Sequence, residues 1–302
     1  MSNLHDLETS NFHLHLTGAL YVEDVRELGT AEDVPCPGET AWENFDCPDV
    51  WSAAKELTST PAGLRRAIGR VVVREAGAHT EYVELTLNPF GMIRRGMTPD
   101  SIAETLASVE SSHPRPRLKI KFGVNRKDGP ASIAAVAASY AACPPELRAG
   151  IDLNGDEQQF PTADFVEGFC KLARAGIMTT LHAGEFPGMT DSLRDALRAE
   201  PSRIGHAVAA GDSPALLRQL ATREITVECA PTSNRVRNVV RSMAEHPIRR
   251  FIDEGVPVVF GTDDPGFFRN AMTDELAVLR QAGLSDADIT ELNALANQQR
   301  LA

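Results

Sequence analysis

Residues 149–185 read AGIDLNGDEQQFPTADFVEGFCKLARAGIMTTLHAGE, and this stretch decides the fold class. It begins with a short apolar run, Ala149 to Leu153, and continues through polar residues into a helical pattern from Asp164 to Ala175 that stops at Gly176. A second apolar run follows from Ile177 to His182. A strand, a helix and a second strand in this order predict a βα unit, and such units build parallel sheets.

Six further runs are predicted to form strands on either side of this stretch. They are Asn11 to Leu16, Glu81 to Leu87, Leu118 to Val124, Arg203 to His206, Ile225 to Cys229 and Pro257 to Gly261. Together with the two runs above, they supply the eight strands that a closed barrel requires. The chain has 302 residues, 42% of them hydrophobic, which suffices for one such domain over residues 1–302. The predicted fold class is therefore α/β, a (β/α)8 TIM-type barrel.

Helices are predicted in most of the gaps between these strands. The further predicted helices are Pro99 to Ser108, Ser213 to Leu220, His246 to Glu254 and Asp286 to Gln298. The segment from Tyr21 to Thr60, between the first two strands, is instead rich in Pro, Gly and Trp and is predicted to be irregular. Because this connection falls at the catalytic face of a barrel, we expect it to form a short lid or substrate wall.

Composition excludes several classes of partner. A net charge of -12 opposes binding to a nucleic-acid polymer or to an anionic membrane surface, since both require clustered Lys and Arg. No stretch approaches the roughly 18 continuous apolar residues of a membrane span, and the first ten residues do not resemble a signal peptide. The five cysteines are scattered and odd in number, which favours free thiols in the cytoplasm. The sequence does not predict the oligomeric state.

Residues that can bind a metal gather where the predicted strands end. They lie on the first strand and at or just after the ends of the fifth, sixth and eighth strands: His13, His15, His182, Glu185, His206, Asp263 and Asp264. Each alone has an ordinary structural explanation, such as a histidine lining the barrel or an aspartate forming a turn. Because the carboxyl ends of all strands meet at one face of a barrel, the combination predicts a metal site with chemistry around it.

The order of motifs points to a family. The motifs are HLHLTGAL (His13 to Leu20), GIDLNGDE (Gly150 to Glu157), HAGE (His182 to Glu185), RIGHA (Arg203 to Ala207), PTSN (Pro231 to Asn234) and TDDP (Thr262 to Pro265). This set resembles the adenosine deaminase family of metal-dependent amidohydrolases. The resemblance implies a zinc-dependent enzyme of purine metabolism that replaces an amino group of a small purine-like molecule by oxygen and releases ammonia.

The resemblance also implies a ligand set for one Zn²⁺ ion per chain. The implied ligands are His13, His15, His182 and Asp263; Asp263 also counts among the catalytic residues and His15 among those near the substrate. Three imidazoles and one carboxylate leave room for water, as a catalytic zinc site requires. Binuclear relatives carry a lysine at the end of a mid-barrel strand, whereas the fourth strand here ends in Asp152 to Asp156 without one. A single metal is therefore favoured.

The remaining implied roles concern the substrate ring. Glu185 would donate a proton to a ring nitrogen, and His206 would act as a base or as an electrostatic stabiliser. Asp264 would contact a second ring nitrogen, and the main chain at Gly155 a third. Ser233 and Asn234 are interpreted either as substrate contacts or as turn residues, Cys229 as a buried small side chain, and His246 receives no role.

One position departs from the family pattern. Typical members read HLDG after the second histidine, with an aspartate that binds the ribose 5′-hydroxyl, whereas this chain has Thr17 in HLTG. A neutral hydroxyl does not repel an anionic substituent as a carboxylate does. We therefore expect a substrate that differs from adenosine at the sugar or its 5′ end. Two alternatives stay open: a deaminase of another amino-heterocycle such as a pterin, and a non-catalytic ligand-binding relative.

Overall fold

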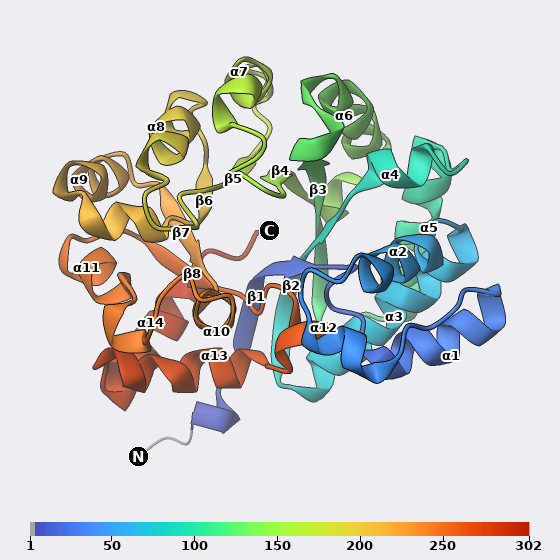
Figure 1. Ribbon diagram of the computed structural model, residues 1–302, viewed down its shortest axis with the longest axis horizontal. Helices are drawn as coiled ribbons and strands as arrows, with labels where there is room; N and C mark the ends of the chain where they lie inside the picture. The colour runs from blue at the N-terminus through green and yellow to red at the C-terminus, as the bar shows by residue number, and fades with distance from the viewer. Residues whose placement is uncertain (1–3, 302) are drawn as a thin grey trace.

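The computed structural model describes residues 4–301 and contains one sheet of eight parallel strands in sequential order. The strands are β1 (Thr9–His15), β2 (Thr80–Leu87), β3 (Arg117–Asn125), β4 (Arg148–Asn154), β5 (Thr179–Ala183), β6 (Arg203–His206), β7 (Thr226–Cys229) and β8 (Val258–Phe260). Helices alternate with them and surround the strands as a ring (Figure 1). This is the predicted (β/α)8 barrel in a single domain.

The helices occupy every connection between strands and most of the remaining chain. They are α1 (Val22–Glu32), α2 (Pro48–Leu57), α3 (Pro61–Gly77), α4 (Pro89–Ile93), α5 (Pro99–Ser112), α6 (Ile133–Ala142), α7 (Val166–Arg174), α8 (Thr190–Arg198), α9 (Pro214–Thr222), α10 (Pro231–Val236), α11 (Ile248–Asp253), α12 (Pro265–Phe268), α13 (Met272–Val278) and α14 (Asp286–Asn297). Several begin at a side-chain cap, such as Thr98 before α5 and Ser285 before α14. Among residues 4–301, no helix is long and apolar enough to cross a bilayer.

The segment from Tyr21 to Thr60 was predicted to be irregular, and that prediction is wrong. It contains α1, α2 and the short 3-10 helix Glu39–Glu43. The prolines misled the prediction because Pro48 occupies the first position of α2, where a missing backbone N–H costs nothing. Residues 43–46 of this segment nevertheless line the main cavity, so a role as substrate wall stays a prediction.

The barrel closes through a very short contact between β1 and β8. The seven other neighbouring pairs form ladders, whereas here β1 has one isolated bridge, from Leu14 to Asp263, which lies three residues beyond the end of β8. The backbone N–H of His15 donates to the Asp263 carbonyl at 3.0 Å, and that of Asp263 donates to the His13 carbonyl at 2.8 Å. The bridge therefore places Asp263 between two histidines of β1.

A network of buried charges fills the interior of the barrel below this bridge. Glu228 of β7 accepts two hydrogen bonds from the Lys121 ammonium of β3, at 2.7 and 2.8 Å. Arg203 of β6 donates to Glu84 of β2 at 2.8 Å. All four side chains are at most 5% exposed, so each charge depends on its partners rather than on water.

Candidate active site

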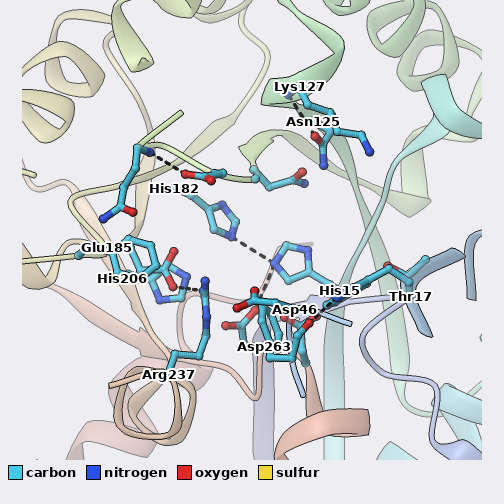
Figure 2. Close-up of a pocket in the computed structure, with 18 of the residues that line it drawn as sticks. His15, Thr17, Asp46, Asn125, Lys127, His182, Glu185, His206, Arg237 and Asp263 are labelled. Carbon is cyan, nitrogen blue, oxygen red and sulfur yellow. Dashed lines mark hydrogen bonds and ion pairs between the residues drawn. The ribbon is translucent and has the colours of Figure 1, made fainter. Parts of the chain in front are cut away.

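Four side chains from three parts of the barrel converge at the carboxyl end of the strands. Figure 2 shows three of them, His15, His182 and Asp263. His13 and His15 lie on β1, His182 lies on β5, and Asp263 follows β8. The Nε2 atom of His15 is 3.1 Å from Nε2 of His182 and 3.4 Å from Oδ1 of Asp263. The Nε2 atom of His13 is 3.7 Å from the same carboxylate oxygen. The structure thus brings together the four residues implied as metal ligands.

Two buried carboxylates orient two of these histidines. Glu228 lies 2.8 Å from Nδ1 of His13, and Asp152 lies 3.0 Å from Nδ1 of His182. Because a carboxylate accepts, Nδ1 of each ring carries the proton and Nε2 presents its lone pair to the cluster. The hydroxyl of Ser233 donates to Oδ2 of Asp263 at 2.6 Å, which leaves Oδ1 for the histidines. Ser233 is therefore a positioning residue rather than a free turn residue.

The donor set fits a metal ion. Nε2 of His13 is buried and has no hydrogen-bond partner, although unpaired buried polar atoms are costly. Burial lowers the pKa of His15 to about 3, so its imidazole is neutral and can bind a cation. Three imidazole nitrogens and one carboxylate oxygen match the ligands of catalytic zinc. His13, His15, His182 and Asp263 could therefore hold one such ion.

His206 lies beside the cluster and belongs to a chain of hydrogen bonds. The backbone N–H of Ile248 donates to Nδ1 of His246 at 3.2 Å, so the proton of His246 is on Nε2. That Nε2 lies 3.1 Å from Oδ1 of Asn234, whose Nδ2 lies 3.2 Å from Nδ1 of His206. These hydrogen bonds fix the Asn234 amide as a donor to Nδ1 of His206. The proton of His206 is therefore on Nε2, which is buried and has no hydrogen-bond partner. Burial, assisted by nearby His13, holds the pKa of His206 well below its usual range.

Glu185 is positioned by a hydrogen bond from its backbone N–H to Glu157 and by an ion pair between its carboxylate and Arg237. The Glu157 carboxylate accepts from the backbone N–H groups of Gly184 and Glu185, both at 2.8 Å, which fixes the loop after β5. The Glu185 carboxylate contacts the Arg237 guanidinium (Figure 2). Burial raises the pKa of Glu185 and outweighs the opposing effect of Arg237. A carboxyl with a raised pKa is suited to donate a proton.

Asp264 and Gly155 both line the main cavity, although they lie far apart in the sequence. Burial and the neighbouring Asp263 carboxylate raise the pKa of Asp264 well above its usual range, and its Oδ1 has no partner. A Cβ on Gly18 would lie 1.6 Å from that oxygen, so only glycine fits there. Gly155 has a φ of 97°, a conformation that glycine adopts without strain.

The cluster lies in a cavity of about 1060 Å³. Its wall includes all the residues implied to contact substrate, Thr17, His15, Gly155 and Asp264, together with Glu185 and His206. A volume of this size is at the upper end for ligand pockets and exceeds what a purine ring alone fills. The site therefore has space for a substituent on the ring.

Sequence reasoning missed five residues that shape this site. They are Asp152, Glu157, Glu228, Arg237 and His246. A usable signal existed for two of them, because a carboxylate within an apolar strand, as in GIDL or ITVEC, must have a partner inside the barrel. Glu157 is the last residue of the motif GIDLNGDE, whereas Arg237 and His246 act through loop contacts that no local pattern reveals.

Comparison with known proteins agrees with this geometry. A model of the family described as Adenosine deaminase matches residues 9–299. The chain is 30% identical over 301 residues to the adenine deaminase of Sinorhizobium medicae, covering 96% of this chain and 93% of that protein. It is 31% identical over 309 residues to the aminodeoxyfutalosine deaminase of Streptomyces coelicolor, covering 95% and 78%. The zinc-bound amidohydrolase from Burkholderia ambifaria superimposes with a TM-score of 0.84 at 22% identity, covering 99% and 87%.

The barrel and its histidine–aspartate cluster define the class of metal-dependent amidohydrolases. Within that class, the chain belongs to the adenosine deaminase family, as the match over nearly its whole length establishes. The family and its relatives support hydrolytic deamination of a purine compound.

Proposed function

We propose that this protein catalyses the zinc-dependent hydrolytic deamination of a 6-aminopurine compound: adenosine, adenine or a modified adenine nucleoside. The proposal takes residues 1–302 as one catalytic domain that holds one zinc ion. It places the reaction in the cytoplasm, in keeping with five cysteines that are all free thiols. The substrates named for its relatives differ in what is attached to the purine, so likeness alone leaves that part of the substrate open.

One observation carries this proposal: three imidazoles and one carboxylate converge beside two buried carboxyl groups with raised pKa values. His13, His15, His182 and Asp263 would hold the ion. When bound, zinc supplies Lewis acidity that makes hydrolysis feasible near neutral pH. Strongly perturbed carboxyl groups gathered beside a cluster of possible metal ligands are typical of functional sites.

The carboxyl groups supply protons to the substrate ring. Glu185, whose pKa is raised by burial, would donate a proton to a ring nitrogen as water adds to the neighbouring carbon; of the two protons that water gives up, one would go to the departing amino group and one would return to Glu185. Asp264, whose pKa is raised by burial and by the Asp263 carboxylate, would donate a hydrogen bond to a second ring nitrogen. The backbone at Gly155 approaches the ring closely because no side chain intervenes.

His206 acts as a hydrogen-bond donor in this proposal. The series of hydrogen bonds from Ile248 through His246 and Asn234 leaves the proton of His206 on Nε2, the atom that faces the cluster. A neutral imidazole with this tautomer stabilises negative charge that develops on the attacking oxygen. Of the two roles predicted for His206, the electrostatic one is therefore favoured over that of a base.

Metal analysis combined with an ammonia-release assay tests the proposal. The purified protein should hold about one equivalent of zinc, and His13→Ala or Asp263→Ala should remove it, whereas His113→Ala outside the cluster should not. Adenosine, adenine and a pterin are assayed side by side for ammonia. Two metal equivalents, or full retention in both ligand variants, would contradict the site assignment. Release of ammonia from the pterin alone would contradict the substrate class.

A further inference from the structure

A second cavity, of about 250 Å³, opens off the main one. Five residues line both: Thr17, Lys55, Asn88, Asn125 and Lys127. Figure 2 shows Thr17, Asn125 and Lys127 on the side of the pocket away from Glu185 and Arg237. The side cavity therefore begins at the end of the main cavity that is remote from the proposed proton donor.

The side cavity is basic in an otherwise acidic protein. Its lining includes the side chains of Lys55, Arg94, Arg95 and Lys127 and a single carboxylate, that of Asp128. The whole chain has a net charge of -12, with 42 acidic residues against 30 Lys and Arg. Such a local concentration of positive charge in an acidic chain calls for a negatively charged partner.

Most of these cations have no counter-ion among the residues that the structure describes. Within residues 4–301, Lys55, Arg95 and Lys127 take part in no ion pair, and Arg94 has only Asp128 at 3.7 Å. Burial, together with the nearby charges of Lys127 and Arg95, lowers the pKa of Lys55. Like charges that gather in a cavity repel one another until an anion binds between them.

The chemistry of a 6-aminopurine determines what reaches this end of the pocket. The amino group is on the six-membered ring and must lie by Glu185 and the histidine cluster. The sugar of a nucleoside is attached to the five-membered ring, on the opposite side, and therefore extends away from Glu185. The 5′ carbon is the part of the sugar farthest from the base, so a group on it would extend toward the end of the cavity that Thr17 and the side cavity line.

We propose that the side cavity binds an anionic group, a phosphate or a carboxylate, at the 5′ end of an adenine nucleoside. Lys55, Arg95 and Lys127 would donate charge-assisted hydrogen bonds to it. Thr17 admits the group because its hydroxyl carries no charge and can donate a hydrogen bond of its own. This inference rests on the proposed function, since it names the substrate class of the same site.

The test measures binding of product-like ligands, which requires no turnover. Calorimetry compares inosine, inosine 5′-monophosphate and inosine 5′-carboxylate in the zinc-loaded protein at low and high salt. The better of the two anionic ligands should bind at least tenfold more tightly than inosine, and high salt should reduce this ratio. The tighter anion identifies whether phosphate or carboxylate is the natural group.

Variants locate the effect. Arg95→Met and Lys127→Met should each lower the affinity ratio about tenfold, the loss of one charge-assisted hydrogen bond. Lys127→Arg keeps the charge and should keep most of the ratio. Lys171→Met removes one exposed lysine that pairs with Glu167 on α7 and should leave the ratio unchanged. Thr17→Asp places a carboxylate at the entrance and should bring the ratio below one.

The outcomes separate this inference from the proposed function. A wild-type ratio near one, or a ratio that survives Arg95→Met combined with Lys127→Met, overturns the anion site even if the protein deaminates adenosine. A ratio above ten that these variants abolish supports the anion site. Failure to deaminate any 6-aminopurine, with that ratio intact, would refute the deaminase proposal and leave the anion site standing.

Discussion

Replacing Glu228 by glutamine removes one negative charge from the centre of the barrel without changing the size of the side chain. The carboxylate is fully buried and accepts from Lys121 at 2.7 and 2.8 Å and from His13 at 2.8 Å. Glutamine offers a single acceptor oxygen to these two donors. If Lys121 takes that oxygen, the amide N–H₂ faces Nδ1 of His13 and forces the proton of the ring onto Nε2.

The expected cost has two components. Removing one partner of a buried ion pair costs about 3–5 kcal/mol, and Glu228→Gln should lie near 3 because Lys121 keeps the Phe12 carbonyl at 2.6 Å. For a domain of this size, that corresponds to a fall of about 5 °C in Tm. The displaced proton on His13 should lower zinc affinity by about 10–100-fold, as loss of a partner behind a metal ligand usually does.

Thermal unfolding of the zinc-free protein and zinc competition with a chelator measure the two components separately. Glu81→Gln is the matched control, because that carboxylate contacts Arg115 at 3.0 Å with 37% and 79% of the two side chains exposed. It should change stability by less than about 1 kcal/mol and leave zinc affinity unchanged. A Glu228→Gln protein that unfolds within a degree of wild type and holds zinc as tightly would refute this account of the network.

The other predictions concern the proton donors and a buried histidine. Glu185→Gln should keep zinc and lose about 10²-fold or more in kcat, measured by ammonia release; full activity would place the proton donor elsewhere. Asn234→Asp should reverse the tautomer of His206, because a carboxylate accepts from Nδ1, and lower kcat about 10²–10³-fold with zinc retained; an unchanged kcat would exclude His206 as a donor. Burial lowers the pKa of His246 to about 4, so below about pH 6.5 the unfolded chain binds a proton that the folded chain refuses. Between pH 7 and pH 5, wild type should therefore lose about 2 kcal/mol more stability than His246→Gln in urea unfolding, and equal losses would contradict this.

The strands could be predicted from the sequence because each is a short apolar run bounded by polar residues. All eight predicted runs overlap the observed strands, and Arg203–His206 agrees at both ends. The ends of the others shift by a residue or two, as at β5, which begins at Thr179 rather than Ile177. Hydrogen bonding to a neighbour sets a strand's end, and that is not visible in one segment alone.

The sequence predicts those residues of the candidate site that lie at the ends of strands, but not the residues that position them. His182 and Asp263 come directly from strand geometry, since carboxyl ends of parallel strands meet at one face. The partners behind them could not be predicted, because Glu228 and Asp152 are recognised only when the barrel is closed around them. The same holds for Arg237, which reaches Glu185 from the loop after α10.

The candidate metal site lies where the barrel is joined only by the bridge between Leu14 of β1 and Asp263, just beyond β8. An ion held by His13, His15 and Asp263 would cross-link the first and last strands at the one place where the sheet has no ladder. Without it, a local fluctuation at this seam frees two strand edges, and exposed edges are templates for aggregation. An ion bound at these residues would therefore also stabilise the closed barrel by mass action.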